Sequence, residues 1–386
     1  MDFSFTPEQE QFRQEVRAFC REAMADERMR ALIGVGHEDH DPILYRKIAE
    51  RGWIGMQWPR EYGGQERSRV DMCIFYEEMN YARARIGRYT GSVVFVGESI
   101  VTYGTEQQKA EFLPRIARGE LTCCWGLTEP GSGSDAAALQ MRAVDQGDHF
   151  VVTGQKVFTS GAHLADMGMF AVRTDPSAPK YHGISLLLID MNSPGITLRP
   201  LHTLGGWRVN ETYLDQVVVP KERLMGQQNE GWKHVLTTLG FERSGIASVG
   251  AVMRTADDLA AYMAQRERAG QPVAQAHKDR FADLVAQLHA ARWMGYRVAW
   301  MQDQALPDLA RSSMVKVLAS DLQLHMANLV VDVLGLDGLV QGPQAPLDGL
   351  AEQLYRAALF HHLGGGTMEM QLNAIALQGL GLPRGA

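Results

Sequence analysis

The chain of 386 residues has only four cysteines and no long apolar run. The cysteines form no CxxC pair and show no spacing typical of metal ligands, so we expect neither a disulfide framework nor a metal site. No stretch approaches the roughly 18 consecutive apolar residues of a membrane span, and the N-terminus has no apolar signal core. These absences predict a cytoplasmic protein that does not span a membrane.

The composition also lacks an excess of positive charge. The formal net charge is −7 and no long basic run occurs, so we do not expect nucleic acid as a partner. Hydrophobic residues make up 45% and charged residues 22%, which allows a large buried core. A chain of this length is expected to fold as two or three packed units.

Periodicity divides the chain into three regions and predicts an α+β fold. Residues 1–121 follow mainly a helical period, with Thr6 and Thr105 as expected N-caps. Residues 122–229 contain short β-type runs between glycine, proline and aspartate breaks: HFVVTG, MGMFAVRTD, GISLLLID, ITLRPL and YLDQVVVP. Residues 230–386 return to helix, with breaks near 270–272, 306–307, 335–346 and 364–366. We therefore predict an N-terminal helical domain, a middle β domain and a C-terminal antiparallel bundle.

Two stretches rich in glycine and hydroxyl groups lie in the β region. Residues 125–135 read WGLTEPGSGSD, whose glycines let the backbone bend closely around a ligand. This stretch has neither GxGxxG nor GK[ST], so it is neither a Rossmann fingerprint nor a P-loop, and alone it could be a plain surface turn. Residues 154–161 read GQKVFTSG, where Phe158 and Thr159 place a flat ring beside a hydroxyl. An edge strand with a core phenylalanine would look the same.

The helical run from about Trp232 to Met253 carries a carboxylate on its apolar face. Glu242 falls on the same stripe as Val235, Leu239, Ile246, Val249 and Met253. A carboxylate on such a face is costly unless it is paired or functional, and burial would raise its pKa toward that of a useful base. The pattern leaves two interpretations open, a catalytic base and a structural ion pair with Arg243 or another subunit.

Near the C-terminus, residues 364–371 read GGGTMEMQ. Glycines before a helix leave free N–H groups at the positive end of the helix, which suits a polar ligand, although a flexible hinge would look the same. His361 and His362 precede this stretch and, as neighbours on a helix, point in different directions, so we interpret them as structural.

In this order, these segments resemble the acyl-CoA dehydrogenase family along nearly the whole chain. The resemblance is carried by YGTEQQKAEFLP, LTEPGSGSD, GQKVFTSG, VVVP, LGFERSGIA and GGGTMEMQLNAIALQGLGLPR. It implies a C-terminal four-helix bundle, FAD between this bundle and the β domain, and an acyl-CoA substrate that is dehydrogenated to the trans-2-enoyl-CoA. It also implies electron-transferring flavoprotein as the electron acceptor and a homotetramer or dimer, with a mixed tetramer as a further possibility.

Position by position, the resemblance implies roles for individual residues. Gly365 stands where many members carry the catalytic base, whereas Glu242 matches the base of a branch that includes enzymes for isovaleryl-CoA and some long-chain acyl-CoAs. Flavin N5 would accept the hydride. The residues implied to line the flavin ring are Trp125, Leu127, Thr128, Gly133, Ser134, Phe158 and Thr159. The residues implied to contact substrate are Ser134, Arg243 and the N–H group of Gly365.

Other parts of FAD are implied to meet residues of the C-terminal region. Thr367 and Glu369 match positions near the flavin, and Arg268 matches an arginine that reaches the FAD pyrophosphate of a neighbouring subunit. The chain departs from the family at Phe158, where tryptophan is usual, in the segment AGQPVA after Arg268, and in the adenine segment at residues 332–338.

Two other functions remain open, because fold does not settle chemistry. One is a flavin oxidase or monooxygenase on the same fold, and the other is an FAD-binding partner subunit of a mixed tetramer. The arginines at 83, 85 and 88 add a hypothesis on substrate, since they precede a run that resembles the family helix lining the acyl pocket. Glutaryl-CoA dehydrogenase holds its substrate's carboxylate with an arginine in a comparable stretch. Arg85 or Arg88 would then face the pocket, although solvated arginines at a helix end would give the same sequence.

Overall fold

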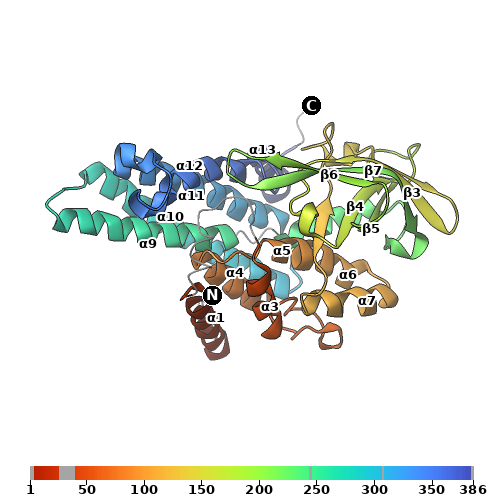
Figure 1. The fold of residues 1–386 in the computed structure, drawn as a ribbon, viewed down its shortest axis with the longest axis horizontal. Helices are drawn as coiled ribbons and strands as arrows, with labels where there is room; N and C mark the ends of the chain where they lie inside the picture. Colours follow the sequence, from red (N-terminus) through yellow and green to blue (C-terminus); the bar gives the residue numbers. More distant parts are fainter. Residues whose placement is uncertain (1–3, 26–39, 243–245, 307, 384–386) are drawn as a thin grey trace.

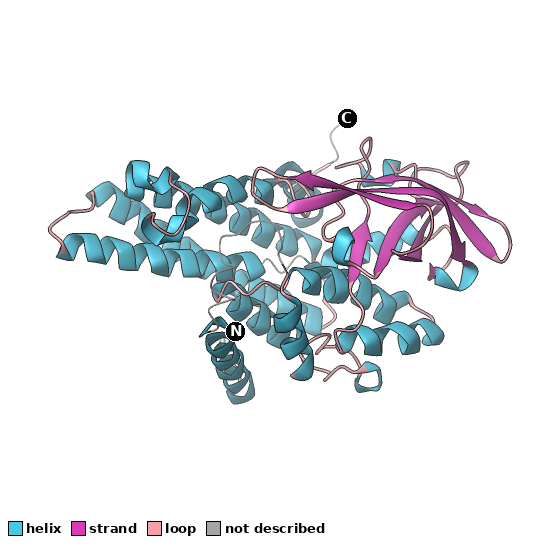
Figure 2. Cartoon of the chain, in the orientation of Figure 1, coloured by secondary structure: helices cyan, strands magenta, loops and turns pink. Residues whose placement is uncertain are grey.

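The computed structural model describes residues 4–25, 40–242, 246–306 and 308–383, without the side chains of residues 241–247. It places a group of N-terminal helices beside a twisted sheet and a bundle of long helices (Figures 1 and 2). The predicted α+β arrangement is confirmed: helices precede the sheet in the chain, and helices follow it.

Two of the N-terminal helices begin where the sequence predicts them. Thr6 and Gln9 exchange backbone-to-side-chain hydrogen bonds, and Thr105 and Gln108 form the same capping box. A π-helical segment, Thr90–Gly97, precedes α6. The helices of this region are α1 (Pro7–Ala25), α3 (Pro42–Glu50), α4 (Arg69–Tyr81), α5 (Gly87–Tyr89), α6 (Glu98–Tyr103) and α7 (Glu106–Ala117).

All five predicted β-type runs form strands of one sheet. Its strand order is β6-β7-β3-β2-β4-β5-β8, and β1 pairs in parallel with β4, so that Trp125 lies opposite Met169. β3 lies between β7 and β2 over residues 150–153, whereas residues 154–156 pair with β7 alone among the described strands, so this end of β3 lies at an edge, as that interpretation expected. The strands are β1 (Cys123–Gly126), β2 (Arg142–Asp145), β3 (His149–Lys156), β4 (Met167–Arg173), β5 (Ile184–Asp190), β6 (Ile196–His202), β7 (Arg208–Pro220) and β8 (Leu224–Met225).

The C-terminal helices break at the predicted places. α9, α10 and α11 pack against one another, and α12 and α13 pack against α11. By length and composition alone α11 could cross a membrane, but half of its apolar stretch is buried inside the protein. The helices are α8 (Gly231–Glu242), α9 (Ile246–Arg268), α10 (Gln275–Asp303), α11 (Leu309–Leu334), α12 (Leu350–Ala358) and α13 (Met368–Ala374).

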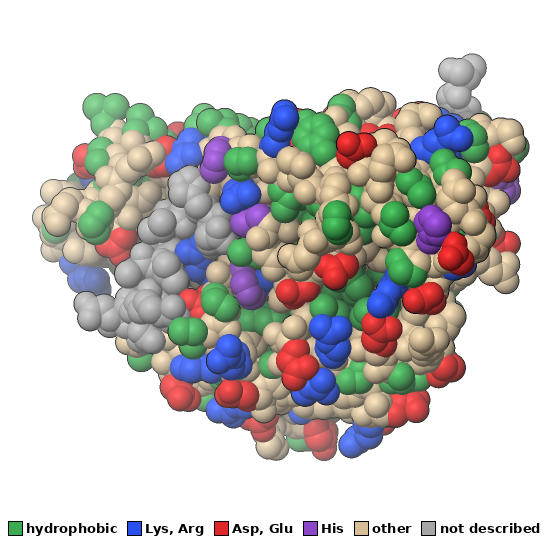
Figure 3. All heavy atoms as spheres, turned by 45° about the vertical axis from the view of Figure 1, so that its right-hand side comes forward, with side chains coloured by type: hydrophobic (Ala, Val, Ile, Leu, Met, Phe, Trp, Pro, Cys, Tyr) green, Lys and Arg blue, Asp and Glu red, His purple; other side chains and the backbone are tan. Residues whose placement is uncertain are grey.

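The sheet contacts the bundle through the hairpin between β6 and β7. The ring of Trp207 packs on Phe360, with ring centroids 5.2 Å apart, and Arg356 of α12 donates a hydrogen bond to the carbonyl of Leu204. These contacts fix the C-terminal glycine-rich stretch relative to the β region. On the face shown in Figure 3, basic and acidic side chains alternate across the surface.

Candidate active site

The two glycine-rich stretches of the β region meet at the end of β3. The N–H of Val157 donates to the carbonyl of Thr128 at 2.9 Å, and Nζ of Lys156 donates to the carbonyl of Leu127 at 3.1 Å. Residues 127–129 therefore run against the segment that carries Phe158. The structure thus brings together stretches that are separate in the sequence.

The loop after β1 leaves open space beside its glycines. A Cβ atom added at Gly131 or Gly133 would meet no atom of the described residues within 4 Å. Ser134 is exposed, and Trp125 is half-buried with its ring stacked on that of Phe95 (centroids 6.4 Å apart). A flat ligand could therefore approach this backbone closely, which is the use that the sequence predicted for the glycines.

Phe158 lies just beyond the end of β3 and points out of the protein. Its side chain is 60% exposed, so the interpretation as a core phenylalanine is wrong. Its φ angle of 59° lies in the left-handed region, which a non-glycine residue keeps only where its surroundings hold it there, often at ligand sites.

The hydroxyl group expected beside the ring can come from two neighbouring residues. Thr159 is only 1% exposed, and its hydroxyl has no hydrogen-bond partner within the part of the chain that the structure describes. Ser160 has an exposed side chain, and sequence reasoning missed it. The serine next to Thr159 in the sequence, a second hydroxyl beside the ring, is the signal that could have identified it.

These observations fit the ring end of FAD. The open glycines offer room for a planar group, the exposed ring of Phe158 offers a stacking surface, and the buried hydroxyl of Thr159 lacks a partner among the described residues. Arg268 does not lie beside the glycine-rich loop, Phe158 and Thr159. It is exposed at the end of α9, which runs away from the sheet in Figure 1, so within one chain it cannot serve this loop.

The C-terminal glycines precede a helix, as predicted. Gly365 and Gly366 have φ angles of 69° and 91°, and the side chain of Thr367 caps α13 by accepting from the N–H of Met370 at 3.4 Å. Glu369 is exposed in the first turn, where hydrogen bonds from its own N–H and from the Thr367 hydroxyl lower its pKa. This arrangement offers N–H groups at residue 365 but no carboxylate there.

Glu242 is the last residue of α8, but its side chain, like all of Arg243, lies outside the described part of the protein. Of the predicted apolar stripe, Val235 and Leu239 belong to α8 and are buried and half-buried, and Val249 lies in α9 and is buried. The location of the Glu242 side chain on an apolar face and its role both stay predictions.

The arginines at 83, 85 and 88 have different surroundings. Arg88 is buried and donates to the carbonyls of Gly161 at 2.5 Å and Ser160 at 3.2 Å, which argues against a role in holding a substrate carboxylate. Arg83 pairs with Asp258 at 2.8 Å. Arg85 is half-buried and also interacts with other residues, so the carboxylate hypothesis stays a prediction.

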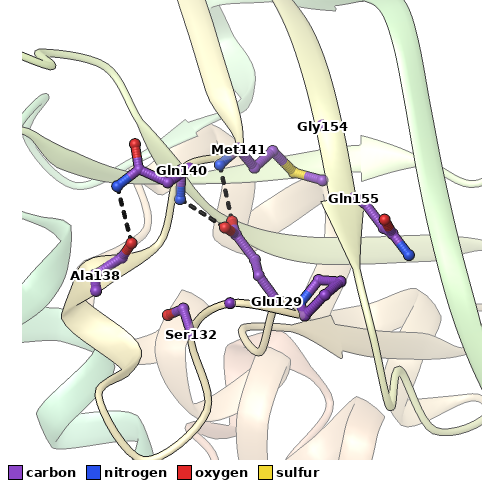
Figure 4. A pocket seen from close by; sticks show the side chains of 9 residues that line it. Glu129, Ser132, Ala138, Gln140, Met141, Gly154 and Gln155 are labelled. Carbon is purple, nitrogen blue, oxygen red and sulfur yellow. Dashed lines mark hydrogen bonds between the residues drawn. The ribbon is translucent and has the colours of Figure 1, made fainter.

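A buried ion pair, Glu129–Lys156, lies behind the loop, and sequence reasoning missed it. The Glu129 carboxylate accepts from Nζ of Lys156 at 2.7 Å. It also accepts from the N–H groups of Gln140 and Met141 at 2.6 and 2.8 Å, as Figure 4 shows. Lys156 is 0% exposed, and burial lowers its pKa to about 8 although Glu129 opposes this shift. The carboxylate also lines a pocket of about 270 Å³ between the loop and β3.

Comparison with known proteins identifies the family of this chain. Profiles of the acyl-CoA dehydrogenase N-terminal, middle and C-terminal domains match residues 6–120, 124–217 and 229–380. Acyl-CoA dehydrogenase FadE26 of Mycobacterium tuberculosis is 35% identical over 100% of this chain and 99% of its own. Two solved structures, the Tcur3481-Tcur3483 steroid ACAD and the ChsE4-ChsE5 complex from Mycobacterium tuberculosis, are both 34% identical. They give TM-scores of 0.91 and 0.90 with 100% of both chains covered. The chain therefore belongs to the acyl-CoA dehydrogenase family and is an oxidoreductase of that family.

Proposed function

We propose that this protein uses FAD to dehydrogenate an acyl-CoA thioester to the trans-2-enoyl-CoA, a step of the β-oxidation type. The observation that carries the proposal is the open loop at Gly131 and Gly133 beside the exposed ring of Phe158, in a chain that matches the family over all three domains. FAD, when bound, supplies the two-electron acceptor for the hydride that leaves the β-carbon.

The chain's own residues would then remove the α-proton, stabilise the developing negative charge and bind the cofactor and substrate. Glu242 removes the α-proton as general base, because glycine occupies position 365 and cannot do so. The N–H of Gly365 donates to the thioester oxygen and stabilises the negative charge that develops there. Trp125, Leu127, Thr128, Gly133, Ser134 and Phe158 would line the flavin, and Ser134 and Arg243 would also contact acyl-CoA. We propose the domain division 1–121, 122–229 and 230–386 for this arrangement.

The test is anaerobic reduction of the flavin by a panel of acyl-CoAs. We expect the purified protein to be yellow and to bleach with at least one linear, branched, dicarboxylic or steroid side-chain acyl-CoA. Glu242→Gln should keep FAD and bind acyl-CoA but reduce the flavin about a hundredfold or more slowly, since positioned bases contribute roughly 10²–10⁴-fold. Glu230→Gln, at an exposed residue just before α8, is the matched control and should reduce it normally.

The alternatives give other results in the same experiment. Flavin that stays oxidised with every acyl-CoA but turns over with oxygen and a reductase would favour a monooxygenase. Near-normal reduction in Glu242→Gln would exclude this residue as the base. The expected final acceptor is electron-transferring flavoprotein, which should reoxidise the bleached enzyme.

A second proposal concerns assembly. The two solved structures are each named for a pair of proteins, and one pair is described as a complex, which favours a partner subunit for this chain as well. Arg268, exposed at the far end of α9, would serve the FAD of a neighbouring subunit. If the chain forms a homotetramer or dimer with one FAD per chain when purified alone, the mixed assembly is excluded.

We place the protein in the cytoplasm.

A further inference from the structure

The turn at residues 157–161 holds a strained residue and is bonded along its length. The N–H of Thr159 donates to the carbonyl of Asn210 at 3.0 Å, and Nδ2 of Asn210 donates back to the carbonyl of Thr159 at 3.0 Å. Together with the bond from Val157 to Thr128, these contacts fix the backbone on both sides of Phe158. A residue at φ 59° persists only when its surroundings determine its conformation in this way.

Two buried cations complete this set of contacts, one at each end of the turn. Lys156 precedes it and bonds the carbonyl of Leu127 and the carboxylate of Glu129. Arg88 comes from the N-terminal helices and bonds the carbonyls of Ser160 and Gly161. Hydrogen bonds from charged donors are roughly twice as strong as neutral ones, so the bonds from these cations contribute most to fixing the conformation of the turn.

The partners of these cations all lie in the two stretches proposed to line the flavin. Lys156 bonds the loop at Leu127 and Glu129 while its own backbone directly precedes the turn, so it connects one wall of the site to the other. The approach of Arg88 is close: a Cβ atom at Gly161 would lie 1.5 Å from its guanidinium. Arg13, which is buried as deeply, bonds Glu77, Glu78 and Tyr296 in the helical regions instead.

We propose that Lys156 and Arg88 are positioning residues, which hold the turn in the conformation that presents Phe158 to the flavin. The proposal rests on the proposed function for its ligand, but its structural part does not need the ligand. The charge of Lys156 is neutralised by Glu129, so it acts through geometry rather than by attracting the cofactor. The prediction is that either cation, when removed, loosens the turn in the protein without FAD and weakens FAD binding.

The experiment compares Lys156→Met, Arg88→Met and Arg88→Lys with Arg13→Met as the matched buried-cation control. Hydrogen exchange of the amides of Val157 and Thr159 is measured in FAD-free protein, and FAD affinity and the visible flavin spectrum are measured by titration. We expect both methionine variants at the turn to exchange faster, to bind FAD about tenfold or more weakly and to shift the spectrum. Arg88→Lys keeps one charged donor and should fall between them and wild type.

The control separates positioning from stability. Arg13→Met should lower the melting temperature while leaving turn exchange, FAD affinity and spectrum unchanged. If Lys156→Met and Arg88→Lys keep wild-type exchange and affinity, the proposal is overturned, and these two variants decide it even where Arg88→Met does not fold. If the wild type binds no FAD, the proposed function fails, and the exchange data alone decide whether the cations hold the turn.

Discussion

Replacing Gly133 by valine should remove FAD without unfolding the protein. An added Cβ at Gly133 meets no described atom within 4 Å, and the φ angle of this residue is not in the left-handed region, so the chain itself tolerates the side chain. We expect a change in unfolding free energy within about 0.5 kcal/mol, as for ordinary surface substitutions. The branched side chain would project into the space that we assign to the flavin ring, and the protein should purify folded and colourless.

Gly147 provides the opposite case. A Cβ there also meets nothing within 4 Å, but its φ of 100° is unfavourable for any other residue. Gly147→Val should therefore cost roughly 1–3 kcal/mol of stability and leave FAD binding intact. The assay pairs the melting temperature of FAD-free protein with the ratio of flavin to protein absorbance. A yellow Gly133→Val protein with full occupancy would show that the flavin lies elsewhere.

Three further predictions use single residues. Burial lowers the pKa of Lys156 from 10.5 to about 8, so between these pH values the unfolded chain binds more protons than the folded one. The stability of the wild type should therefore rise with pH in this range relative to that of Lys156→Met. A fall in relative stability would mean that the effect of Glu129 on this pKa outweighs burial. Phe158→Trp should fold normally, because the side chain is 60% exposed, and should shift the flavin absorption bands; an unchanged spectrum would argue against ring contact. If Arg85 binds a substrate carboxylate, Arg85→Ala should raise KM for a dicarboxylyl-CoA by two or more orders of magnitude and leave KM for a neutral acyl-CoA unchanged. The reason is that a buried carboxylate left without its partner costs roughly 3–5 kcal/mol. A wild type that prefers the neutral substrate would contradict this.

Local patterns predicted much of the fold. The capping box of Thr105 and Gln108 involves only residues that lie three apart in the sequence. The strands are recognisable from β-branched residues between turn signals. The glycine-rich loop could also be located, because its residue types demand close backbone approach. These features depend on interactions within a few residues, which a single sequence records.

The contacts that hold the site could not be predicted in this way. Arg88 bonds a turn more than seventy residues away, and the sequence alone could not rank Arg88 against Arg85. Glu129 and Lys156 each read as part of a polar stretch, because nothing local shows that both become buried. Burial is set by the assembled sheet, so side-chain partners of this kind follow from the fold rather than from the pattern.

The contact between Arg88 and residues 160–161 also limits how this protein could exchange parts with its relatives. The profile boundary between residues 120 and 124 suggests a place to join an N-terminal region to a foreign middle region. A join there would separate the arginine from the two carbonyls that it bonds. A chimera whose N-terminal donor lacks this arginine would lose both of these hydrogen bonds beside its cofactor loop, and the carbonyl of Gly161 would keep only the bond from the N–H of Leu164. Recombination within the family should therefore keep residues 88 and 160–161 from the same parent.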